Sequence, residues 1–195
     1  MIPEQIIQSF GGTLKTYSKD RTIFNEGEHA DFYYQIKTGH VKMFNLTEDG
    51  KEFVQGFFKN DDSFGEPPLF GDYKYPATAQ TLEDTELYLL SKSAFFELLK
   101  MHPDIHLTFT KMICKRMIYK AKIAREVSIY PPEHRILTLL NHLKSNAKVE
   151  TDFEVPLTRQ QISELTGLRV ETVIRAIKKL EKSKALAIID RKVVI

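Results

Sequence analysis

Residues 157–182 read LTRQQISELTGLRVETVIRAIKKLEK, and this stretch decides the fold of the C-terminal part of the chain. Thr158, followed three positions later by Gln161, forms the capping-box pattern that starts a helix. Gly167 then allows a tight turn with positive φ. Apolar residues recur at three- and four-residue spacing on both sides of that turn: Ile162, Leu165, Val173 and Ile177. The pattern predicts two short helices of a helix-turn-helix, which places its second helix in the major groove of DNA.

The residue types of this stretch suit contacts with bases and phosphates. Arg bonds guanine through two donors, Glu accepts from cytosine, and apolar side chains contact the thymine methyl group. Arg159 and Gln160 begin the first helix, where they can reach backbone phosphates. An ordinary solvated helical hairpin is the alternative reading. The residues expected to contact DNA are Thr158, Arg159, Gln160, Arg169, Val170, Glu171, Thr172, Arg175, Lys178 and Lys179.

The flanking sequence completes a compact C-terminal domain. A helix is predicted over 133–145 and a short strand over 153–155. A closing hairpin over 187–189 and 193–195 would form a wing. Tyr130-Pro131-Pro132 reads as a hinge, because proline restricts itself and the residue before it. The sequence therefore divides into an N-terminal domain (1–103), a long helix with its hinge (104–130) and a winged helix-turn-helix (131–195).

The N-terminal part is predicted to consist of strands. Residues 13–90 contain short segments rich in Phe, Tyr, Val, Ile and Thr, separated by turn residues such as Thr38-Gly39 and Glu48-Asp49-Gly50. Many short, closely spaced strands indicate a sandwich, jelly roll or barrel. The pattern becomes helical at Ser91, and Pro103 marks the end of that helix.

A second, longer helix is predicted from Asp104 to about Ser128, a run without Gly or Pro that would be about 37 Å long. Its apolar residues recur every three or four positions and form a stripe along one face of the helix. We expect this stripe to pack against the same helix of a second subunit, giving a homodimer through 104–128. The alternative is that the helix lies across its own β domain. The stripe comprises Ile105, Phe109, Met112, Ile113, Met117, Ala121, Ala124 and Val127.

Charge and composition restrict the function. Residues 1–102 hold 10 Lys and Arg against 16 Asp and Glu, whereas the rest holds 18 against 10. The basic C-terminal part is thus the part expected to meet a polyanion. The single cysteine, Cys114, excludes an intrachain disulfide and a thiolate-held iron–sulfur cluster. No membrane span, secretory signal or hydrolase motif is visible, so we expect a cytoplasmic, non-enzymatic protein without a membrane partner.

Residues 157–167 and 171–181 resemble the helix-turn-helix of the family of the cyclic-AMP receptor protein and the fumarate-and-nitrate regulator (CRP/FNR). Independently, residues 23–39 resemble the glycine-turned β-roll of cyclic-nucleotide-binding domains. The resemblance covers about residues 13–195. It implies an α+β fold with an N-terminal double-stranded β-helix of jelly-roll type, a long dimerisation helix and a C-terminal winged helix-turn-helix. It also implies a bacterial transcription regulator that works with RNA polymerase.

The same resemblance implies an effector pocket with an altered phosphate-binding cassette. Nucleotide-binding members hold the cyclic phosphate with an Arg-Ser pair, whereas Tyr75-Pro76 stands here. Pro lacks an N–H and Tyr lacks a charge, so cyclic AMP is not expected to bind. Glu66 reads either as a ribose contact or as an acid that caps its own loop, and Lys120 either charges the pocket or is solvated. The implied pocket comprises Phe64, Gly65, Glu66, Tyr75, Pro76, Ala77, Thr78 and Lys120.

The effector itself stays open. The oxygen-sensing branch needs several N-terminal cysteines, which are missing, and the six scattered histidines do not suggest haem ligation. An effector other than cyclic AMP is the first expectation. An effector-free, constitutive DNA-binding regulator and a plain cyclic-nucleotide-binding module are the alternatives. The target genes, and activation versus repression, are equally open.

The recognition sequence resembles the oxygen-sensing branch more than the cyclic-AMP receptors. That branch shares Val170-Glu171-Thr172 with Arg175, and its half-sites have a TGA core. Glu171 and Arg175 lie four residues apart and would read bases from one helix face. Val170 suits a thymine methyl group. We expect double-stranded DNA with an inverted repeat of TTGA-like half-sites. Ile174 stands where that branch has a hydroxyl, which leaves one outer base open.

Overall fold

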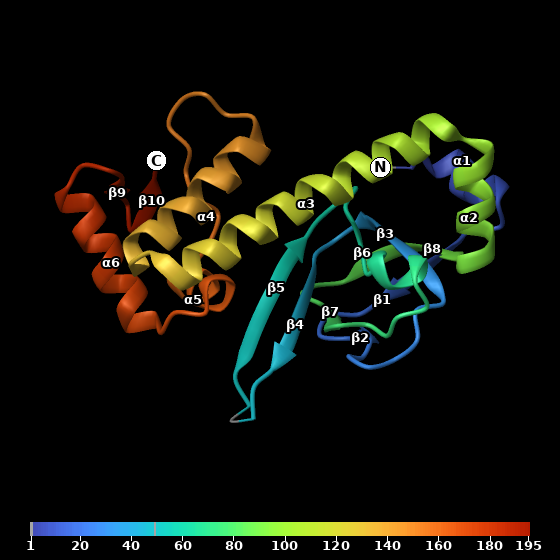
Figure 1. The fold of residues 1–195 in the computed structure, drawn as a ribbon, viewed down its shortest axis with the longest axis horizontal. Coiled ribbons are helices and arrows are strands. Elements are labelled where there is room, and N and C mark those ends of the chain that lie inside the picture. The colour runs from blue at the N-terminus through green and yellow to red at the C-terminus, as the bar shows by residue number, and fades with distance from the viewer. Residues whose placement is uncertain (1, 49) are drawn as a thin grey trace. The chain divides into compact units, whose positions relative to one another are not determined.

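The computed structural model describes residues 2–48 and 50–195, except for the side chains of residues 127 and 128. Asp49 of the predicted turn and the Val127 side chain of the predicted stripe lie outside the described residues. The chain forms two compact units that meet within one long helix, between Cys114 and Lys115. Figure 1 shows the strands of the first unit in blue to green and the helices of the second in orange to red.

The first unit is built on two four-stranded antiparallel sheets, as the strand pattern predicted. One has the order β1-β8-β3-β6 and the other β2-β7-β4-β5. Neighbours far apart in sequence, such as β1 and β8, pair in full register. Buried side chains of both sheets fill the space between them, among them Ile36 and Leu87, which are fully buried. The fully buried Tyr33 faces the helices instead, and its ring stacks on that of Phe95 with centroids 4.6 Å apart. The strands are β1 (Thr13–Tyr17), β2 (Thr22–Phe24), β3 (Phe32–Thr38), β4 (Val41–Leu46), β5 (Glu52–Phe58), β6 (Ser63–Phe64), β7 (Thr78–Thr81) and β8 (Thr85–Ser91).

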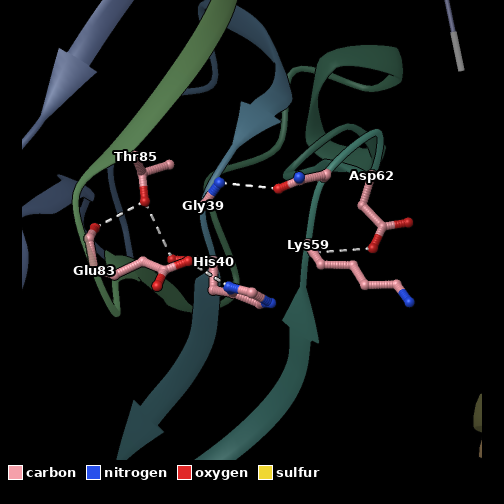
Figure 2. Close-up of polar contacts among 7 residues, drawn as sticks. Gly39, His40, Lys59, Asp62, Glu83 and Thr85 are labelled. Atoms are coloured by element: carbon pink, nitrogen blue, oxygen red, sulfur yellow. Dashed lines mark hydrogen bonds and ion pairs between the residues drawn. The ribbon is translucent and has the colours of Figure 1, made fainter.

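One turn of this roll requires glycine. Gly39 has φ +105°, and a Cβ there would lie 2.9 Å from the Cα of Thr85. Its N–H donates to Asn60 Oδ1 at 2.9 Å, and His40 Nδ1 lies 2.5 Å from Glu83 Oε1. These contacts join three turns of the roll at one place (Figure 2). A side chain at position 39 would push these turns apart.

Helices complete the first unit. Ser91 starts the predicted helix, because its hydroxyl oxygen accepts from Ala94 N at 3.4 Å. The long helix begins at Pro103, as expected from the sequence. Two short elements had no clear sequence signal: the first helix, of six residues, and a 3-10 helix between β6 and β7. The elements are α1 (Glu4–Ser9), η1 (Pro67–Phe70), α2 (Lys92–Met101) and α3 (Pro103–Ile129).

The roll covers the first half of the apolar stripe of α3. Phe109 is buried in the core of the first unit, and Ile105, Met112 and Ile113 pack against that core. For these four residues the alternative reading, that the helix lies across its own β domain, is right. Met117 is 65% exposed. The sequence periodicity predicted an apolar stripe correctly but could not say which surface covers each part of it.

The second unit contains the three helices and the hairpin predicted for residues 131–195, together with the end of α3 from Lys115 onward. Its core includes Ile136, Leu140, Ile162 and Val173, all fully buried. The predicted strand over 153–155 forms only an isolated bridge to β10, although three backbone hydrogen bonds join residues 153–155 to residues 193–195. The elements are α4 (Pro132–Ala147), α5 (Arg159–Thr166), α6 (Val170–Lys182), β9 (Ala187–Ile189) and β10 (Lys192–Val194).

Candidate nucleic-acid interface and effector pocket

A complete capping box starts α5. Thr158 Oγ1 accepts from Gln161 N at 3.1 Å, and Gln161 Oε1 accepts from Thr158 N at 2.9 Å. These two bonds satisfy backbone donors that would otherwise be unpaired at the helix start. Arg159 and Gln160 follow in the first turn. Arg159 is half-buried, and desolvation lowers the pKa of its guanidinium, while Gln160 is exposed.

Side chains from two helices fix the turn between α5 and α6. Gly167 has φ +66° and ends α5. Ser163 Oγ donates to the carbonyl oxygen of Leu168 at 2.5 Å, and Arg135 of α4 donates to that of Thr166 at 3.2 Å. The carbonyls on either side of the glycine are therefore both held. Neither Arg135 nor Ser163 was singled out from the sequence, because their partners are backbone atoms that only the fold brings near.

The two faces of α6 differ sharply. Val173, Ala176, Ile177 and Leu180 are buried against α4 and α5. The predicted DNA contacts divide by position: Arg169 is the exposed N-cap residue, and Val170 and Thr172 in the first turn are half-buried. On the opposite side α6 exposes Glu171, Ile174, Arg175, Lys178, Lys179, Glu181 and Lys182. We call Glu171, Ile174, Arg175, Lys178, Lys179 and Lys182 the recognition face. This face can present donors, an acceptor and one aliphatic group to a groove.

The two adjacent lysines of the recognition face have different surroundings. Lys179 Nζ lies 2.9 Å from Glu133 Oε1 of α4. The hydrogen bond from Lys179 lowers the pKa of the Glu133 carboxyl. Lys179 thereby ties α6 to α4, a role that the sequence pattern did not indicate. Lys178 is exposed on the neighbouring position.

Aromatic rings occupy the roll at the predicted effector pocket. Tyr75 is 3% exposed and stacks on Phe24, with ring centroids 3.6 Å apart and planes 9° apart. Phe64 stacks against Phe24 and Tyr34, at 6.0 and 5.5 Å. Burial raises the pKa of Tyr75 strongly and that of Tyr34 to about 12. A Cβ on Gly65 would lie 3.0 Å from the Phe24 ring, so the β6 end packs closely here.

The charged groups of this region are a buried carboxylate and partly or fully exposed cations. Glu66 is 1% exposed and accepts a short hydrogen bond from Ser63 Oγ, so its carboxylate serves its own loop. No Lys or Arg side chain is buried in the described part of the first unit. Lys42 is half-buried, and its Nζ lies 2.5 Å from Glu52 Oε2. A buried phosphate without a cation or other charged donor nearby would be unfavourable.

The remaining predicted pocket residues are spread over different environments. Ala77 is buried, Thr78 is half-buried at the start of β7, and Pro76 is exposed. The Pro76 carbonyl accepts from Asn45 Nδ2 at 2.7 Å. Lys120 belongs to the second compact unit and is exposed on α3. The structure thus gathers Phe64, Gly65, Glu66 and Tyr75 around one loop of the roll.

Comparison with protein families matches both units separately. Residues 14–102 match the model described as "Cyclic nucleotide-binding domain", and residues 134–195 match the "Crp-like helix-turn-helix domain". The chain belongs to the CRP/FNR family. The cyclic-AMP-activated global regulator CRP of Pasteurella multocida is 27% identical over 93% of this chain and 89% of its own. Members of the CRP/FNR family are DNA-binding transcription regulators, and this chain is a regulator of that type.

Solved structures show the same fold. FixK2 of Bradyrhizobium japonicum superposes with a TM-score of 0.75 at 24% identity, covering 94% of this chain and 92% of that chain. The regulator CLP of Xanthomonas campestris gives a TM-score of 0.76 at 21% identity and covers 99% of both chains. CLP is a c-di-GMP-responsive global regulator. The CRP/FNR fold thus extends over the whole length of the chain.

No helix within residues 2–48 and 50–195 is long and apolar enough to cross a membrane. No group of three or more His, Cys, Asp or Glu in the same residues could hold a metal ion.

Proposed function

We propose that this CRP/FNR regulator binds DNA as a cytoplasmic homodimer, at an inverted repeat of TTGA-like half-sites. The recognition face of α6 carries this proposal, because it presents Glu171 and Arg175 four residues apart, both exposed. Glu can accept from cytosine and Arg can bond guanine, as the two strands of a TGA core require. Each subunit would read one half-site, about two helical turns from the other.

The exposed side of α3 supports a dimer with a seam displaced from the predicted stripe. Leu107 is 55% exposed and Met117 is 65% exposed. They belong to a series with alternating three- and four-residue spacing, the spacing of coiled-coil a and d positions. The series comprises Leu107, Thr110, Cys114, Met117, Ala121 and Ala124, all exposed in the single chain. We propose that the same helix of a second copy covers this series.

An effector other than cyclic AMP would control the dimer. Only a ligand that prefers one arrangement of the long helices can shift the two recognition helices. The stacked rings of Tyr75 and Phe24 favour, as second candidate, a regulator that binds DNA without any effector. RNA polymerase is the expected partner in either case.

Cyclic AMP is expected to produce no binding heat with the wild-type protein at micromolar concentrations. The reason is the missing cation and the buried carboxylate of Glu66 at the pocket. Isothermal titration calorimetry checks this. A micromolar or tighter dissociation constant would show that the cassette has been placed on the wrong residues.

Replacing Lys178 by Ala is expected to weaken binding to all duplex sequences alike. Each lost phosphate contact reduces the magnitude of the slope of log K against log salt by about 0.9. A dimer has two copies of Lys178, so the slope of the variant should be smaller in magnitude by about 1.8. Lys179→Ala is the matched control and should change the slope less, because its ammonium group is bonded to Glu133. Fluorescence anisotropy over a salt series measures both. Equal slopes for the two variants would mean that Lys179 leaves Glu133 for a phosphate.

A further inference from the structure

Ile174 is the one aliphatic side chain on the recognition face of α6 as the structure describes it. It is 40% exposed, and its neighbours on that face are charged: Glu171, Arg175, Lys178, Lys179 and Lys182. Isolated exposed apolar residues are common on protein surfaces and need no explanation by themselves. Here the residue lies in the middle of the surface proposed to enter the major groove.

The fold does not account for Ile174. The core of the second unit and the partly buried residues packed against it do not include Ile174. By contrast, Val173 and Ile177, on either side of it in sequence, are fully buried. The aliphatic group of Ile174 is therefore available to a partner rather than to the core.

The major groove offers one apolar group on its base edges, the 5-methyl group of thymine. A β-branched side chain on a helix has one strongly preferred χ1 rotamer, so little rotamer freedom is lost when it makes contact. Val170 lies one turn before Ile174 on the same side of α6. The two aliphatic side chains form a strip beside Arg175, which suits consecutive thymines next to a guanine.

We propose that Ile174 is a specificity-determining residue that selects a thymine through its 5-methyl group. The inference rests on the proposed function, in which α6 enters the major groove. The contact is made by the methyl group and not by a hydrogen bond, which separates it from the proposed base contacts of Glu171 and Arg175.

Deoxyuridine tests the inference, because it differs from thymidine only by that methyl group. Each thymine of one half-site is replaced singly in the preferred duplex, and dissociation constants are measured by fluorescence anisotropy at fixed salt. For the wild type, deoxyuridine should weaken binding about fourfold at one thymine other than the one that Val170 contacts, as expected for one buried methyl group. The deoxyuridine ratio is the dissociation constant of the deoxyuridine duplex divided by that of the thymidine duplex. In Ile174→Ala this ratio should fall to about one at that position and remain unchanged at the other thymines.

Two further variants keep the test decisive. Ile174→Val should retain most of the ratio, because it keeps a β-branched methyl group. Ile189→Ala removes another exposed isoleucine, 55% exposed on β9, and should leave every ratio unchanged. Two outcomes overturn this inference and leave the proposed function standing. In the first, the wild type binds sequence-specifically but all its deoxyuridine ratios are near one. In the second, the fourfold ratio persists in Ile174→Ala. A wild-type protein without sequence preference overturns both.

Discussion

Replacing Met117 by Glu is expected to convert the dimer to a monomer at micromolar concentration. Met117 is 65% exposed in the single chain and occupies a d position of the proposed seam. Two facing carboxylates in an apolar seam cost several kcal/mol, because buried charge needs a partner. About 3 kcal/mol corresponds to a dissociation constant more than a hundredfold weaker. Sedimentation velocity measures the change.

Lys122→Glu is the control for this variant, because it adds negative charge to an exposed position outside the seam. It should remain dimeric. Ile113→Glu is a poorer probe, since Ile113 packs against the core of the roll and its change would disturb folding. Cys114 offers a second measurement, because a short bismaleimide should link the two copies of this residue in the seam. A dimeric Met117→Glu variant, or wild type that sediments as a monomer, would refute the seam.

Replacing Arg175 by Ala is expected to weaken binding to the preferred duplex by about 1–3 kcal/mol, roughly 5- to 150-fold. The loss comes from the two donors that bond guanine. Discrimination at that guanine should disappear, while the other positions keep theirs. Anisotropy titrations on duplexes with each of the four base pairs at that position measure the effect.

Lys178→Ala serves as the comparison for Arg175→Ala, since a phosphate contact carries no base preference. It should weaken all four duplexes by the same factor. An Arg175→Ala variant with intact guanine discrimination would assign base reading to another side chain of the recognition face.

The helix-turn-helix was predictable because its signals are local. Thr158 and Gln161 form the capping box that their spacing indicated, and Gly167 adopts the positive φ expected of it. These features depend on residues three or four positions apart. The roles of Lys179 and Arg135 were not predictable, because their partners on other helices are brought near only by folding.

The long helix shows the limit of periodicity. Its apolar residues were correctly placed on a helix, but Phe109 is buried by the roll while Met117 is exposed. An apolar stripe has the same spacing whether its own domain or a second copy covers it. The choice depends on residues far away in sequence, such as Tyr33, whose ring centroid lies 6.5 Å from that of Phe109. The sequence alone therefore did not show that the roll covers Ile105, Phe109, Met112 and Ile113.

The effector pocket combined a predictable and an unpredictable part. The loss of a cation at Tyr75-Pro76 followed from residue type alone. That the Tyr75 ring stacks on Phe24 did not, because the two residues are 51 positions apart and meet only where η1 returns the chain to β7. Glu66 had two readings from sequence, and its bond with Ser63 supports the one in which it serves its own loop.

Selection of binding sites from random duplex DNA tests the central claim most directly, that a dimer reads an inverted repeat through the recognition face of α6. Purified full-length protein is incubated with a random library at moderate salt, and bound DNA is sequenced over several rounds. The account predicts an inverted repeat of TTGA-like half-sites, about two helical turns apart. Recovery of a single, unpaired half-site, of a motif without a TGA core, or of no motif would contradict it.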